Sequence, residues 1–156
     1  MYNLIGIFMK IEQLSQALQV VGIELRTTNI EAMRTIPPHW QRFGEEAVLA
    51  HIPHRLSDDV YAVYTHFENA GSNNTGLYSM VIGASVPARA EVPAGMVRVV
   101  IPASQRAVFD VESMRMDLVG ATWIEIWGRT DLAKTFIAEY ERYGADGRIA
   151  VSIGLQ

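Results

Sequence analysis

The sequence predicts an α+β fold in which a strand-helix-strand-strand (β-α-β-β) unit occurs twice and forms antiparallel sheet with two main helices. The chain has 156 residues, of which 49% are apolar, and this suits one compact domain. Strand-like and helix-like hydrophobic periods follow one another in the same order in both halves. Short segments of the halves also match: 64–71 with 140–147, and 78–83 with 149–154. The sequence therefore indicates an internal duplication.

The first half has three predicted strands. Apolar and polar residues alternate from Val20 until the turn former Asn29, which is typical of a half-buried strand. Two further β-rich runs, 60–67 and 77–83, are separated by a segment rich in Gly, Ser and Asn. We therefore expect these two strands to be joined as a hairpin.

A helix is predicted between the first strand and this hairpin. Pro37 and Pro38 indicate its start, because proline is tolerated only in the first helical turn. The helix is expected to run to about His51, before Pro53. Its apolar face comprises residues at helical spacing: Trp40, Phe43, Ala47 and Ala50.

The second half repeats this order. The runs 96–102 and 106–112 are β-rich, and Pro102 separates them. A helix follows, since four apolar residues share one helical face: Val119, Trp123, Ile126 and Trp127. The runs 136–143 and 148–154 then predict another pair of strands.

Neither half has enough residues to bury its own helix face, so the halves should pack side by side. We expect one domain, 18–156, made of two pseudo-repeats at about 18–90 and 91–156. Such units leave a cleft near the internal two-fold axis, where a ligand can bind. Residues 1–17 form an N-terminal appendage, and a short amphipathic helix is predicted there from the spacing of Ile11, Leu14 and Leu18.

Composition argues against several function classes. The net charge of −4 provides no positive field for a phosphate backbone, so no direct nucleic-acid partner is expected. No apolar run approaches the roughly 20 residues that span a bilayer, so no membrane partner is expected. Cysteine is absent, which together with the lack of a secretory pattern predicts a cytoplasmic location. Glycine-rich phosphate-binding motifs are missing, so we expect no cofactor.

The motifs of catalysis and metal binding are also incomplete. Ser85 follows Gly83 as in a nucleophile elbow, but Pro87 occupies the place of the second glycine. His51 and His54 are separated by a proline that removes the helical register needed to aim both rings at one metal ion. We therefore predict no catalytic residue and no metal site, and expect a binding protein rather than an enzyme.

Aromatic rings interleaved with carboxylates stand out in the sequence, although any single ring is more typical of a core. The set is Trp40, Tyr61, Tyr64, Tyr78, Phe109, Trp123, Trp127, Tyr140 and Tyr143, with Glu125, Glu139 and Glu141. In the strand 136–143, Glu139, Glu141 and Tyr143 share one face. If Phe136 and Tyr140 pack under the helices, that face is hydrated on periodicity alone. Glu125 projects away from its helix's apolar stripe and is expected to be solvated.

Seven short segments, taken in order, resemble the effector-binding domain family. They are YAVYTHFE from Tyr61, YSMVIG from Tyr78, VPAGM from Val92, IPA from Ile101, AVF from Ala107, WIEIW from Trp123 and YERY from Tyr140. These GyrI-like domains are often attached to AraC-type or MerR-type transcription regulators and are also found alone. The chain is particularly similar to stand-alone members carried on integron gene cassettes, over about residues 20–154.

The resemblance implies a duplicated fold with a central cleft for hydrophobic, often cationic, drug-like molecules. It places Glu141, in the strand motif YERY, at the floor of the pocket, and it implies that Trp127, Trp40 and Tyr61 line the walls. The full set of candidate ligand-binding residues is Glu141, Trp127, Trp40, Tyr61, Tyr143, Tyr78 and Trp123.

Three functions follow from the resemblance. The first is a sensor or regulatory module that binds lipophilic cations without turnover. The second is a hydrolase of strained electrophilic compounds, as in some GyrI-like relatives, with a pocket carboxylate activating water. The third is an interaction protein that signals to a separate transcription regulator or binds a protein target, as gyrase-inhibiting relatives do.

Overall fold

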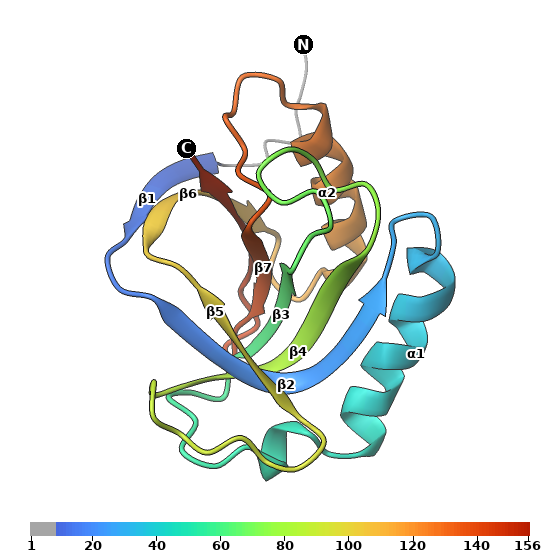
Figure 1. Cartoon of the computed structure of the whole chain (residues 1–156), viewed down its shortest axis with the longest axis vertical. Helices are drawn as coiled ribbons and strands as arrows, with labels where there is room; N and C mark the ends of the chain where they lie inside the picture. The colour runs from blue at the N-terminus through green and yellow to red at the C-terminus, as the bar shows by residue number, and fades with distance from the viewer. Residues whose placement is uncertain (1–8) are drawn as a thin grey trace.

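The computed structural model describes residues 9–156 (Figure 1). The strands are β1 (Met9–Leu14), β2 (Leu18–Thr27), β3 (Val60–Thr65), β4 (Tyr78–Val86), β5 (Val97–Ile101), β6 (Ser104–Val111), β7 (Ala138–Tyr143) and β8 (Ile149–Leu155). The α-helices are α1 (Ala32–Glu45) and α2 (Val119–Gly128), and two 3-10 turns, η1 (Leu49–His51) and η2 (Met116–Leu118), adjoin them.

The eight strands form one antiparallel sheet in the order β1-β6-β8-β7-β3-β4-β2-β5. This confirms the predicted fold, because β2-α1-β3-β4 and β6-α2-β7-β8 are two β-α-β-β units. Equivalent strands of the two units lie at equal distances from the centre of the sheet: β3, β4 and β2 follow one another on one side, and β7, β8 and β6 on the other. An internal two-fold axis therefore passes between β3 and β7.

The outermost strands are exchanged between the two units. β1 precedes β2 in the chain but pairs with β6, while β5 precedes β6 but pairs with β2. The helix predicted at the N-terminus is therefore wrong over β1, and residues 1–8 of the expected appendage lie outside the described residues. Leu14 and Leu18 reach the same apolar cluster from two successive strands, which explains why their spacing resembled that of a helix.

The start of α1 differs from the prediction. The helix begins at Ala32, so Pro37 and Pro38 lie inside it rather than at its first turn. Their missing N–H groups leave the carbonyls of Met33 and Arg34 without intrahelical partners. Both residues are exposed, so water can satisfy these carbonyls and the prolines are tolerated.

The end of α1 also comes earlier than expected. The helix stops at Glu45, and Ala47 adopts a left-handed conformation with φ 49°. Ala47 and Ala50 are exposed and do not belong to the apolar face; Val48, 2% exposed, enters the core instead.

Both α-helices lie on the same side of the strongly curled sheet (Figure 1). Trp40 and Phe43 of α1 pack on a cluster built around β2, β3 and β4. Trp123 and Ile126 of α2 pack on an equivalent cluster built around β6 and β8. A third cluster fills the opposite, concave side of the sheet, between its central strands and β5. The two helix-side clusters meet at the centre of the sheet.

Candidate functional site

Glu141 lies at this meeting point and is 3% exposed. Its Oε2 accepts hydrogen bonds from the Tyr64 hydroxyl at 2.7 Å and from the Trp123 Nε1 at 2.7 Å. Its Oε1 accepts one from the Tyr143 hydroxyl at 2.6 Å. The three donors come from β3, α2 and β7, so the carboxylate joins both units of the duplicated fold.

The structure reverses the expected orientation of β7. Tyr140 packs on the concave side of the sheet, whereas Glu141 and Tyr143 face the helices. The expectation that Tyr140 packs under the helices is therefore wrong. The alternation of side chains along β7 shows which residues share a face of the strand. Aromatic rings occur on both faces, however, so the alternation does not show which face the helices cover. The structure thus buries Glu141 where periodicity alone favoured hydration.

Tyr64 is a site residue that the sequence prediction did not include. Ile82 of β4 and Ile153 of β8 are equivalent buried positions of the two helix-side clusters. Ile82 pairs with Ala62, and continuing the β7–β8 register by one pair puts Glu139 opposite Ile153. Ala62 is therefore the counterpart of Glu139, and Tyr64 that of Glu141. The overlay of residues 64–71 on 140–147 was out of register by one residue, which hid this equivalence.

An aromatic cluster surrounds the carboxylate, and its members come from both units. Tyr64 and Tyr143 each pack against both helix-side clusters. The Trp40 ring stands edge-on to Tyr143, with 5.3 Å between centroids. The Trp123 ring stands edge-on to Tyr64 at 5.5 Å. Such edge-to-face contacts hold the rings in defined orientations around Glu141.

Two other predicted site residues lie farther out in this cluster. The Trp127 ring lies 6.0 Å from that of Trp123 and is 46% exposed, so it reaches the surface beside α2. The Tyr78 ring lies 5.9 Å from that of Tyr64, and its hydroxyl donates to Asn29 at 3.0 Å.

The structure does not bring Tyr61 to Glu141. Tyr61 packs on the concave side of the sheet, where its ring lies 5.6 Å from that of Tyr140 and the Arg142 guanidinium lies over it. The reason is the alternation along β3: Tyr61 and Val63 face one way, and Ala62 and Tyr64 the other. Six of the seven predicted site residues thus lie on the helix side, and Tyr61 does not. Glu125 is exposed, as predicted.

The pKa values at the site reflect burial and the hydrogen bonds that neutral groups donate to Glu141. Burial raises the pKa of Glu141, and the hydrogen bonds from Tyr143, Tyr64 and Trp123 act against this rise. Burial and the Glu141 charge together raise the pKa of Tyr64 well above its ordinary value and that of Tyr78 to about 12. The phenols therefore remain protonated donors at neutral pH.

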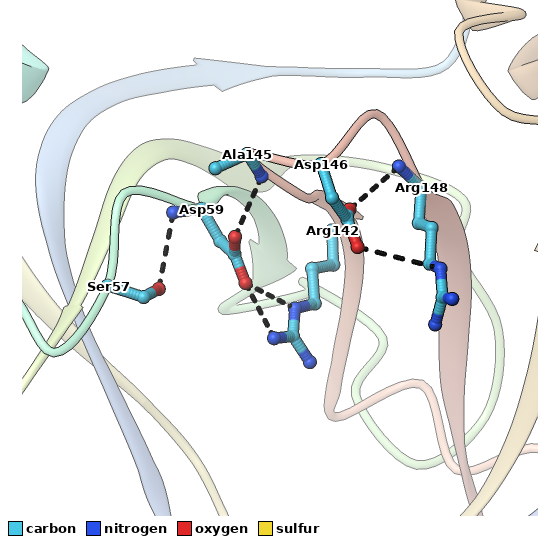
Figure 2. A network of polar contacts seen from close by, with 6 residues as sticks. All are labelled: Ser57, Asp59, Arg142, Ala145, Asp146 and Arg148. Carbon is cyan, nitrogen blue, oxygen red and sulfur yellow. Dashed lines mark hydrogen bonds and ion pairs between the residues drawn. The ribbon is translucent and has the colours of Figure 1, made fainter.

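A second acidic site lies on the concave side and has a different character (Figure 2). Asp59 accepts hydrogen bonds from the Arg142 guanidinium at 2.5 and 2.9 Å and from the Ala145 N–H at 2.9 Å. Asp146 beside it pairs with Arg148. A hollow of about 450 Å³ opens over these groups. Because each of these acids already has a basic partner within the chain, the arrangement is that of a structural network, and Glu141 is the better candidate for ligand binding.

Two features are absent within residues 9–156. No group of three or more His, Asp or Glu side chains is placed to hold a metal ion. No helix in this part of the chain is long and apolar enough to cross a membrane.

Solved structures share this architecture. The integron cassette protein VCH_CASS2 from the mobile metagenome of Vibrio cholerae has a TM-score of 0.75 at 19% identity, over 95% of both chains. SAV2435, solved bound to tetraphenylphosphonium, has a TM-score of 0.78 at 17% identity, over 96% of this chain and 94% of that one. A putative transcription regulation protein from Staphylococcus aureus MU50 has a TM-score of 0.74 at 16% identity, over 97% and 99%.

These likenesses define the fold class, that of duplicated α+β domains such as the GyrI-like proteins. The family follows from the sequence itself. The profile of the integron-associated effector binding protein family, Cass2, matches residues 10–148. The chain belongs to this family, which confirms the resemblance seen in the sequence. No curated protein sequence matches the chain significantly.

Proposed function

We propose that this protein binds lipophilic organic cations at Glu141, between α1 and α2. The observation that carries the proposal is a carboxylate 3% exposed, surrounded by aromatic rings and bonded only by neutral donors in the described part of the chain. The family description, an effector binding protein, and the tetraphenylphosphonium bound to SAV2435 support it.

The energetics favour a weakly hydrated cation. A carboxylate about 4 Å from a positive charge contributes on the order of 4 kcal/mol at an effective dielectric of about 20. Each ring face adds about 0.5–2 kcal/mol. Removing both ions from water opposes binding, and this cost is smallest for a delocalised charge carried by a greasy molecule. The site should therefore prefer such cations to inorganic ions or primary amines.

The hydrogen bonds to Glu141 prepare the site for this role. They hold the carboxylate in one orientation and favour its ionised form, while the rings supply faces for the ligand. Trp123 belongs to α2, and Trp127 on the same helix reaches the surface. If α2 were displaced, a ligand could reach the Glu141 carboxylate at the boundary between the two β-α-β-β units.

Two ions of the same shape and opposite charge test the proposal. Tetraphenylphosphonium should bind with a heat measurable by calorimetry, and tetraphenylborate should not. Glu141→Gln should weaken phosphonium binding at least tenfold, a change of about 1.4 kcal/mol. The control is Glu125→Gln, which removes an exposed charge from α2 and should leave the affinity unchanged.

The proposal fails if both ions bind equally well, or if the phosphonium binds Glu141→Gln as tightly as wild type. Recovery of the ligand unchanged after incubation separates binding from hydrolysis.

A further inference from the structure

Glu139 is a second buried acid on the same face of β7, two residues before Glu141. It is 4% exposed, and within residues 9–156 its carboxylate accepts no hydrogen bond. Its partner across the strand pair is Tyr64, the residue whose hydroxyl binds Glu141. Tyr64 therefore connects the two acids.

A buried carboxyl group without hydrogen bonds is costly and uncommon. Leaving a polar group unpaired away from water costs about 1–3 kcal/mol, and more for a charge. The duplicated fold shows that this position does not need an acid, since its counterpart in the first unit is Ala62, which is 0% exposed. Packing alone thus does not account for Glu139.

The charged groups near Glu139 are engaged elsewhere. Arg106 of β6 donates to the Ser152 hydroxyl and to the carbonyls of Ser152 and Ala138. The Lys134 ammonium donates to the Arg129 carbonyl. Neither forms an ion pair with Glu139 among the residues described, although both favour its ionised form. Burial outweighs them and raises the pKa of Glu139 to about 7.

We propose that Glu139 and Glu141 together form a site for dications, in which Glu139 binds the second positive group of a flat aromatic ligand. This inference rests on the proposed function, because Glu141 provides the first anion. Residues two apart on a strand are separated by about 7 Å, so the charges of the ligand should be about that far apart. A flat molecule would cross the Tyr64 ring between the two acids.

Two flat pyridinium ions of similar shape test this. Methyl viologen carries a positive charge on each of its two linked rings, and N-methyl-4-phenylpyridinium carries only one. Wild type should bind the dication at least tenfold more tightly, by calorimetry at pH 8. Glu139→Gln should reduce this preference at least fivefold, and the exposed control Glu125→Gln should retain it.

The pH dependence separates a binding role from a structural one. The preference for the dication should increase between pH 6 and 8 in wild type, as Glu139 ionises beside Tyr64, Arg106, Lys134 and Glu141. It should stay constant in Glu139→Gln.

The outcomes distinguish the two proposals. If the monocation binds with Glu141 dependence but the dication has no advantage, the dication site is wrong and the proposed function stands. If Glu139→Gln weakens both ligands equally, Glu139 is not a second anion and the inference is overturned. If neither these ions nor tetraphenylphosphonium bind, both proposals fall.

Discussion

Two acids on opposite faces of the central strands, Asp59 and Glu141, are both largely buried but have opposite surroundings. Burial alone would raise the pKa of Asp59, yet the Ala145 N–H and the Arg142 guanidinium hold that pKa below its ordinary value (Figure 2). Within residues 9–156 the donors to Glu141 are all neutral, and burial raises its pKa. Asp59 is thus compensated by a basic group of the chain itself, whereas Glu141 is the acid to which we assign cation binding in the proposed function.

The largest expected effect concerns Glu139, a third buried acid, which like Glu141 forms no ion pair within residues 9–156 and can be contrasted with Asp59 through the pH dependence of stability. Glu139, whose pKa moves from 4.5 to about 7 on folding, binds more protons in the folded state than in the unfolded state between these values. The free energy of unfolding should therefore fall by about 3 kcal/mol as pH rises through this window. Urea unfolding at pH 4.5 and 7.5 measures this.

Glu139→Gln is the matched variant, because it keeps the shape and removes the titration. Its free energy of unfolding should depend on pH by about 3 kcal/mol less than that of wild type. An unchanged difference between the two pH values would show that this carboxyl is not the source of the effect.

The acid with a basic partner should behave in the opposite way. Asp59 has a lowered pKa, so its contribution is fully present above about pH 4 and is lost as pH falls below that. Asp59→Asn should cost about 2 kcal/mol at pH 7, because it weakens charge-assisted hydrogen bonds. Chemical denaturation measures the loss.

The same variant sharpens the contrast with Glu141. Asp59→Asn should leave the affinity for tetraphenylphosphonium unchanged, whereas Glu141→Gln should lower the affinity with little loss of stability. A loss of phosphonium affinity in Asp59→Asn at a temperature where it is folded would contradict the division of roles.

The smallest expected effect concerns a single donor to Glu141. Tyr143→Phe removes the hydrogen bond to Oε1 and should cost about 1 kcal/mol of stability. Because that bond favours the ionised carboxylate, its loss raises the pKa of Glu141 further and should move the rise of phosphonium affinity to higher pH. Tyr140→Phe on the opposite face is the control, and an equal displacement of its pH profile would argue against the mechanism.

The strands were largely predictable from sequence because each central strand alternates or is continuously apolar. β1 was not, since it is an edge strand with four exposed residues in the middle and shows no alternation. The start of α1 was misplaced because Pro37 and Pro38 normally exclude a helix interior, and their tolerance depends on exposure that only the fold reveals.

The candidate site was predictable only in part. The family resemblance predicted the role of Glu141. Strand periodicity predicted which residues share its face of β7, but not that this face is the one covered by the helices. Tyr61 and Tyr64 are both aromatic and lie three residues apart, so choosing between them required the register of β3 against β7. The hydrogen bonds that join Glu141 to Tyr64 and Trp123 span the two units, and no local pattern encodes them.

The fusion of the two units in one chain has a consequence for the centre of the molecule. A symmetric dimer of identical halves would have to present the same side chain on each side of its axis, either two acids that repel or two phenols that carry no charge. A single polypeptide is free of that constraint, and its two halves have diverged there. The Tyr64 hydroxyl of one half now donates to the Glu141 carboxyl group of the other, so a point that is geometrically symmetric is chemically polar.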